Sequence, residues 1–143
     1  MKIADLYIRV HSDNEAFALK LIQEQESILR IYCDNNKILI RNVIYDNASA
    51  LSFNRSGWRR YENYISERSD KGNQVGLLFT RWDVFSRNAP DAYRMLNVLN
   101  DNNVLANAIQ QPVDLSIAEN KIMLAIFLAT PENFDEKEAE ASV

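Results

Sequence analysis

The sequence predicts a single α/β domain with three layers, in which helices cover both faces of a mostly parallel central sheet. Short β-branched segments alternate along the chain with longer segments of helical periodicity, which is the pattern of strand–helix–strand units. Residues 75–80 form an almost unbroken apolar run, as expected of a parallel strand buried on both faces. The 143 residues, 47% of them hydrophobic, suffice for one folded core but not for two.

The first half of the chain contains two predicted strands and two predicted helices. In chain order these are a strand over residues 4–10, a helix over 15–33, a strand over 38–45 and a helix that runs through Trp58, Tyr61 and Ile65. The strands are short, apolar and β-branched, whereas the helices repeat apolar residues at helical spacing. Ser56 is the expected N-cap of the second helix, because its hydroxyl can accept a bond from an unpaired helix amide.

The second half continues the alternation. Its predicted elements are a strand over residues 75–80, a helix with Pro90 in its first turn, a strand over 104–109 and a last helix over 117–129. Proline suits a first turn because the helix leaves the N–H at that position unbonded. Pro131 is expected to end or bend the last helix.

Polar residues concentrate after the first three strands, at residues 11–15, 46–55 and 83–88. The carboxyl ends of parallel strands meet at one edge of a sheet, and functional residues of such folds lie in the loops at that edge. We therefore expect these three loops to form one site.

The composition excludes several kinds of site. Cys33 and His11 are the only cysteine and the only histidine, so neither an internal disulfide nor a cysteine-rich or multi-histidine metal site is expected. Three glycines leave no glycine-rich phosphate loop. The sequence therefore predicts no cofactor and no metal. It also has no apolar run of about 18 residues and no apolar signal-peptide core, which favours a cytoplasmic location without a membrane partner.

The net charge of −4 lies in one segment. Residues 131–143 hold five acidic side chains and one basic side chain, whereas residues 1–130 hold 15 of each sign. We expect a neutral domain over residues 1–130, followed by an acidic C-terminal tail, or the end of the last helix, over 131–143. Because duplex DNA is bound mostly through Lys and Arg, this overall charge does not predict tight DNA binding.

Charged and hydroxyl side chains occur where the predicted strands end. An arginine at position 9, near the end of the first strand, is costly unless it is paired or directed at an anion. The second and third loops carry Asp46, Ser49, Arg55, Asp83 and Arg87. Taken singly, each has an ordinary explanation as an ion pair, a helix cap or part of a polar loop.

Together these motifs resemble the catalytic domain of the serine recombinases, the resolvase–invertase family. The resemblance depends on Tyr7-Ile8-Arg9-Val10, on Asp46-Asn47-Ala48-Ser49 with Asn54-Arg55, and on Trp82-Asp83-Val84-Phe85-Ser86-Arg87, in this order. It runs from about Ile3 to about Glu132, and residues 32–33 and 111–116 are also similar to this family.

The resemblance implies site-specific DNA strand cleavage and exchange without metal or nucleotide, in which a serine oxygen attacks the scissile phosphate and forms a phosphoseryl intermediate. It also implies site residues: active-site arginines at Arg9, Arg55 and Arg87, polar residues that order the site at Asp46, Ser49 and Asp83, and a first-helix glutamine at Gln25. Arginine suits this chemistry because its fork matches phosphate oxygens and stabilises the charge that develops on them.

Several positions depart from the family pattern and predict weakened or lost cleavage. His11 stands where the family has its nucleophilic serine, Val84 where it usually has an arginine, and Glu15 where it commonly has a glutamine. Residues 134–140 are acidic where the family is basic, and we expect no C-terminal helix-turn-helix domain within these 143 residues.

Three main interpretations of His11 stay open. The favoured interpretation is a natural loss of the nucleophile. The second is that His11 is an altered nucleophile, since histidine can carry a phosphoryl group. The third is that Ser12 attacks in place of His11. Period-two alternation disfavours Ser12, because neighbours on a strand point to opposite faces. An engineered substitution and a weak metal pair with Asp13 are lesser possibilities.

The last helix carries eight consecutive apolar residues, 122–129. They cover more than two turns and point in every direction, whereas one stripe suffices to cover a sheet. We therefore expect a homodimer through the 117–129 helix, and the resemblance extends this to a tetramer on DNA. The expected contacts are Ile122, Met123, Ile126 and Phe127. The alternative function is a catalytically inactive dimerisation or regulatory module with the same fold.

Overall fold

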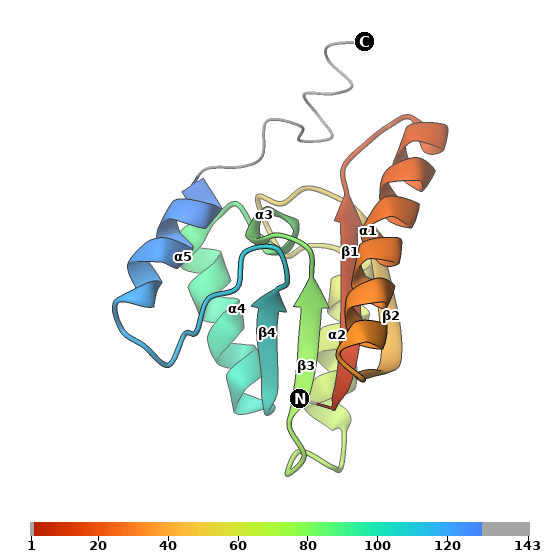
Figure 1. Ribbon diagram of the computed structural model, residues 1–143. Helices are drawn as coiled ribbons and strands as arrows, with labels where there is room; N and C mark the ends of the chain where they lie inside the picture. The colour runs from red at the N-terminus through yellow and green to blue at the C-terminus, as the bar shows by residue number, and fades with distance from the viewer. Residues whose placement is uncertain (1, 130–143) are drawn as a thin grey trace.

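A four-stranded, all-parallel sheet forms the centre of the molecule in the computed structural model, which describes residues 2–129 (Figure 1). The strands are β1 (Ile3–Val10), β2 (Leu39–Asn47), β3 (Val75–Phe79) and β4 (Val104–Ala108), in the spatial order β2-β1-β3-β4. This arrangement confirms the α/β fold with a parallel sheet. The expected tail over residues 131–143 lies outside the described residues.

Helices cover the two faces of the sheet unequally. The helix α1 (Glu15–Asn35) lies on one face, and α2 (Ser56–Glu67) and α4 (Ala89–Asp101) lie on the other (Figure 1). The single turn α3 (Trp82–Phe85) and the helix α5 (Asn120–Ala129) belong to the side of α4.

Alternation along β1 divides the core into two clusters, because successive side chains of a strand point to opposite faces. Leu6 and Ile8 pack with Leu29 and Cys33 of α1. Tyr7 points the other way, into a larger cluster that includes Trp58 and Tyr61 of α2 and Trp82 and Phe85 of α3. Cys33 is buried in the smaller cluster.

Three local predictions are wrong at their boundaries. Ser56 is the first helical residue of α2 and not its N-cap, which is Arg55. The last helix begins at Asn120 and not at residue 117, because a turn around Asp114 precedes it: the Asp114 carboxylate accepts bonds from the Ser116 N–H and hydroxyl. The third predicted loop contains the helical turn α3.

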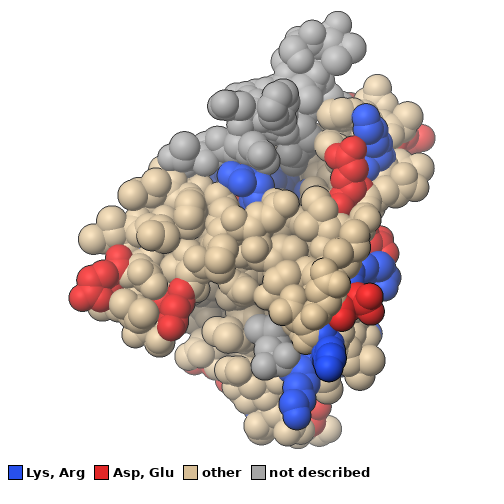
Figure 2. Space-filling model, in the orientation of Figure 1, with Lys and Arg blue, Asp and Glu red and all other residues tan. Residues whose placement is uncertain are grey.

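The helix α5 has one buried side and one exposed side. Leu124 and Leu128 are buried in the larger cluster, whereas Ile122, Met123 and Ile126 are exposed. Phe127 is partly buried and packs against that cluster. In Figure 2, most of the surface over α5 and β4 carries neither acidic nor basic side chains. Among residues 2–129, no helix has the length and apolar character needed to cross a membrane.

Candidate active site

The three expected loops meet at the carboxyl end of the sheet (Figure 1). The Ala48 N–H donates to the Val10 carbonyl over 2.9 Å, which joins the second loop to the end of β1. The Arg87 N–H donates to the Ala50 carbonyl over 3.0 Å, which joins the third loop to the second. Parallel strands with adjacent ends make this convergence possible.

Arg9, near the end of β1, joins the second loop to the third. It is 3% exposed, and its guanidinium donates to three backbone carbonyls: Nε to Val84 at 2.8 Å, Nη1 to Ala48 at 2.9 Å and Nη2 to Asp83 at 2.8 Å. These bonds offset the cost of burying the charge. Gln25 of α1 holds the Arg9 backbone reciprocally, accepting from its N–H at 3.2 Å and donating to its carbonyl at 2.9 Å.

Asp46, at the end of β2, caps the N-terminus of α2 in place of the N-cap residue of that helix. Its Oδ1 accepts from the Gly57 N–H at 2.7 Å, and its Oδ2 accepts from the Trp58 N–H at 2.9 Å. A carboxylate at a helix N-terminus satisfies unbonded amides and interacts favourably with the helix dipole. Arg55, the N-cap residue, makes no side-chain cap bond.

Tyr7 connects Asp46 to Arg55. The Tyr7 hydroxyl donates to Asp46 Oδ2 at 2.8 Å and accepts from Arg55 Nη1 at 3.2 Å. Burial raises the pKa of Tyr7 well above its ordinary value, against the opposing effect of the Arg55 charge. The hydroxyl therefore stays protonated and bridges the two charged groups as a neutral donor and acceptor.

Arg55 is 1% exposed and incompletely bonded. Its Nε donates to the carbonyls of Ser49 at 3.1 Å and Ser52 at 2.9 Å, and its guanidinium lies 4.5 Å from the centre of the Phe53 ring. Its buried Nη2 has no hydrogen-bond partner among residues 2–129. A buried donor without a partner is costly, so this group is the strongest indication of an anion site within the three loops.

The remaining expected residues lie in the same loops. The Ser49 hydroxyl accepts from the Leu51 N–H at 3.0 Å. Asp83 is half-buried, with its Oδ1 at 3.8 Å from Arg81 Nε. Arg87 is half-buried beside Ala50, to which its backbone bonds.

Positions 11 and 12 differ in their surroundings. His11 is half-buried, whereas Ser12 is 4% exposed. The Ser12 hydroxyl accepts from the Asn14 N–H at 3.1 Å and donates to the Asn14 carbonyl at 3.3 Å. The Asn47 side chain holds the Ser12 backbone at both ends, accepting from its N–H at 3.0 Å and donating to its carbonyl at 2.8 Å.

Sequence reasoning assigned no role in the site to Tyr7 or Asn47. It also overlooked a repeated Ser-x-Asn motif, at Ser12–Asn14 and Ser86–Asn88, in which the serine hydroxyl accepts from the asparagine N–H and the asparagine side chain caps the helix that follows. The motif was visible as a cap signal at the start of two predicted helices. The contacts of Tyr7 and Asn47 carry no such local signal, because their partners lie elsewhere in the sequence.

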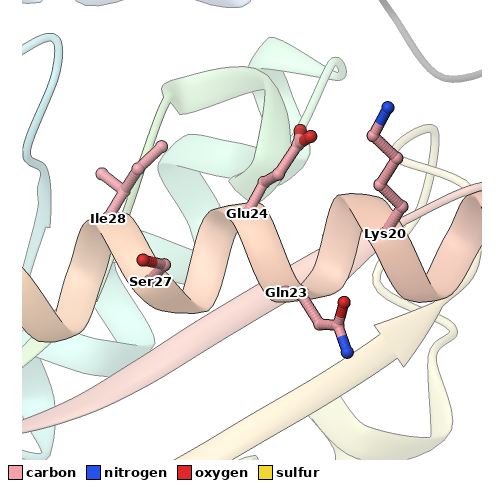
Figure 3. A pocket seen from close by; sticks show the side chains of 5 residues that line it. All are labelled: Lys20, Gln23, Glu24, Ser27 and Ile28. Atoms are coloured by element: carbon pink, nitrogen blue, oxygen red, sulfur yellow. The ribbon is translucent and has the colours of Figure 1, made fainter.

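A shallow hollow on α1 lies outside these loops. Its lining side chains, Lys20, Gln23, Glu24, Ser27 and Ile28, all come from one helix (Figure 3). Ligand sites usually gather polar groups from several elements, so this hollow is a weaker candidate than the three loops. Within residues 2–129, no group of three or more His, Cys, Asp and Glu side chains is placed to hold a metal ion.

The chain is similar to a known protein family in sequence and to solved structures in fold. Residues 4–140 match the family model described as the resolvase N-terminal domain. The N-terminal catalytic domain of TP901-1 integrase is similar in structure, with a TM-score of 0.69, 22% identity, and coverage of 99% of this chain and 100% of that chain. A resolvase family site-specific recombinase from Streptococcus pneumoniae has a TM-score of 0.67 at 20% identity and covers 99% of this chain and 91% of its own. No curated protein sequence matches significantly.

Proposed function

The chain belongs to the resolvase family of serine recombinases through its catalytic domain, and from this membership we propose that its three-loop site binds DNA phosphate while its capacity for strand cleavage is lost or strongly weakened. The observation that carries the proposal is Arg55, a buried arginine whose Nη2 has no hydrogen-bond partner among residues 2–129, in the loop that Arg9 and Asp46 hold in place. A guanidinium held this way suits a phosphate oxygen.

The weakened cleavage follows from two positions. In the family a serine oxygen attacks the phosphate, and the imidazole of His11 has no hydroxyl with which to form a phosphoseryl bond. Val84 has an uncharged, aliphatic side chain, which is 7% exposed and lies in the core cluster, so it supplies no positive charge to a transition state. Loss of one such contact typically costs about 10²–10³ in rate.

Ser12 is a poor substitute nucleophile under this proposal. Its side chain is buried, its hydroxyl bonds to the Asn14 backbone, and Asn47 holds its backbone. An attack by Ser12 would require these bonds to open at the start of α1.

A nicked suicide substrate tests the proposal, because a covalent protein–DNA adduct accumulates on it when strand cleavage occurs. We expect no adduct from the natural chain, and none from His11→Ser alone, since Val84 still lacks the positive charge. An adduct from the natural chain would refute the proposed loss of cleavage, and its disappearance in Ser12→Ala would identify Ser12 as the nucleophile. For phosphate binding, Arg55→Gln is expected to weaken binding of a short duplex relative to Arg59→Gln, an exposed arginine on α2.

The second candidate function is that of a dimerisation or regulatory module, and the exposed side of α5 favours it. Ile122, Met123 and Ile126 are 69%, 46% and 56% exposed, and apolar surface gathered on one helix side often marks an interface. We propose that a second copy of this chain covers it. Phe127 contributes less to this interface than the sequence suggests, because it packs against its own core.

Sedimentation across a concentration series tests the dimer. Ile126→Glu should shift the dimer to monomer, whereas Ile31→Glu, at a similarly exposed position (58%) on α1, should not. A monomer at high micromolar concentration, unchanged by Ile126→Glu, would exclude this interface.

A further inference from the structure

The single turn α3 lies between α5 and the end of β1, and it contacts both. It has only four residues, Trp82–Phe85, and its N-cap residue Arg81 makes no side-chain cap bond. A helix this short is unstable by itself, because nucleation fixes several residues for few bonds. The position of α3 must therefore be set by contacts from outside it.

Gln111 supplies two such contacts from the segment that leads to α5. Its side-chain Oε1 accepts from the Trp82 N–H at 2.8 Å, and its backbone carbonyl accepts from the Trp82 indole Nε1 at 3.0 Å. Gln111 is 9% exposed, so water competes little for these bonds. The side-chain bond satisfies an amide that the first turn of a helix leaves unbonded.

The two middle residues of α3 hold the guanidinium of Arg9. Two of the three carbonyls that accept from Arg9 belong to α3, namely those of Asp83 and Val84, both at 2.8 Å. Hydrogen bonds weaken steeply as their angle departs from linear. A tilt of α3 therefore moves both acceptors together and disturbs the orientation of Arg9.

We propose that Gln111 is a positioning residue: its side chain holds α3 in the place from which the Asp83 and Val84 carbonyls orient Arg9. Its importance for DNA rests on the proposed function, in which the loops that Arg9 joins bind DNA phosphate. The positioning itself is a property of the fold and is measurable without DNA.

Hydrogen exchange of arginine Nε–H groups in the ¹⁵N-labelled full chain tests this inference. Gln111→Leu removes the acceptor at similar volume, and we expect exchange of the Arg9 Nε–H to rise roughly 2- to 10-fold, the effect of losing about one hydrogen bond. Exchange of the Arg55 Nε–H should stay unchanged, because its acceptors, Ser49 and Ser52, lie in another loop. Gln111→Glu keeps an acceptor oxygen and should restore the natural rate for Arg9, and the exposed neighbour Gln110→Leu is the matched control.

Two results would overturn the inference: an unchanged Arg9 rate in Gln111→Leu, or equal increases at Arg9 and Arg55, which indicate general destabilisation. If Gln111→Leu does not fold, Gln111→Asn replaces it, since its shorter side chain withdraws the oxygen from Trp82 but stays polar.

A parallel titration with a short duplex separates the two proposals. Faster exchange at Arg9 with unchanged duplex affinity supports the positioning role and contradicts a phosphate role for Arg9.

Discussion

Gly57 shows how closely α2 approaches the end of β2. A Cβ at this position would lie 2.6 Å from the Tyr45 carbonyl oxygen and 2.8 Å from Asp46 Oδ1. We predict that Gly57→Ala lowers the free energy of unfolding by about 1–3 kcal/mol, because either the helix or the capping carboxylate must shift. Urea unfolding followed by circular dichroism measures the change.

Gly72 provides the control for this substitution. A Cβ there would meet no atom within 4 Å, and its φ is not positive. Gly72→Ala should change the free energy of unfolding by no more than about 0.5 kcal/mol. Equal effects of the two substitutions would mean that α2 does not depend on this close approach.

Glu26 gives a prediction about pH. The Tyr45 hydroxyl donates to its Oε1 at 2.6 Å and Arg30 Nε donates to its Oε2 at 2.7 Å. The bond from Tyr45, and then the bond from Arg30, hold the pKa of Glu26 below its ordinary value. Its contribution to stability is therefore present above the ordinary pKa of a glutamate and is lost as the pH falls through the lowered value.

Tyr45→Phe removes the larger of these two effects. We predict that the pKa of Glu26 rises towards its ordinary value, as measured by an NMR titration of the side-chain carboxyl. Tyr64→Phe, whose ring contacts Arg41, should leave the titration unchanged. An unaltered titration in Tyr45→Phe would show that Arg30 alone accounts for the lowered pKa.

At the scale of elements, α2 and α4 are capped in different ways. The helix α2 is capped by Asp46 of a neighbouring strand. The helix α4 is capped by its own N-cap residue, Asn88, whose Oδ1 accepts from the Asp91 N–H at 3.2 Å. We predict that Asn88→Ala destabilises the protein by about 1 kcal/mol, the usual effect of removing an N-cap side chain. Thermal unfolding measures the change in stability. The control Asn97→Ala, at an exposed position inside the same helix, should not lower the stability, because alanine is the better helix former there. A loss of similar size at both positions would argue against the cap.

At the scale of the whole molecule, charge limits DNA binding. The sequence carries a net charge of −4, and residues 1–130 are neutral. We predict dissociation constants for duplex DNA no tighter than roughly 10⁻⁴–10⁻⁶ M at physiological salt, without sequence preference. Fluorescence anisotropy with two unrelated duplexes of equal length measures both properties. Nanomolar affinity for one duplex over the other would contradict the prediction.

Local patterns determined the architecture and the general location of the site. Alternation of short β-branched segments with helical periodicity was enough to predict a parallel α/β sheet, because these signals act within a few residues. The same pattern placed the loops of Arg9, Arg55 and Arg87 at one end of the sheet. Arg55 and Arg87 do lie in adjoining loops there, and Arg9 lies beside them near the end of β1.

Only the tertiary structure decided which groups bond to one another in those loops. Arg9 bonds to carbonyls 39, 74 and 75 residues away, and Asp46 instead of Ser56 caps α2. The N–H of Trp82 in α3 donates to the side chain of Gln111, 29 residues away. No local propensity specifies such pairs, since they form only after strand order and register bring the loops together. The sequence therefore determined where the site lies, and the packed sheet determined how its side chains are held.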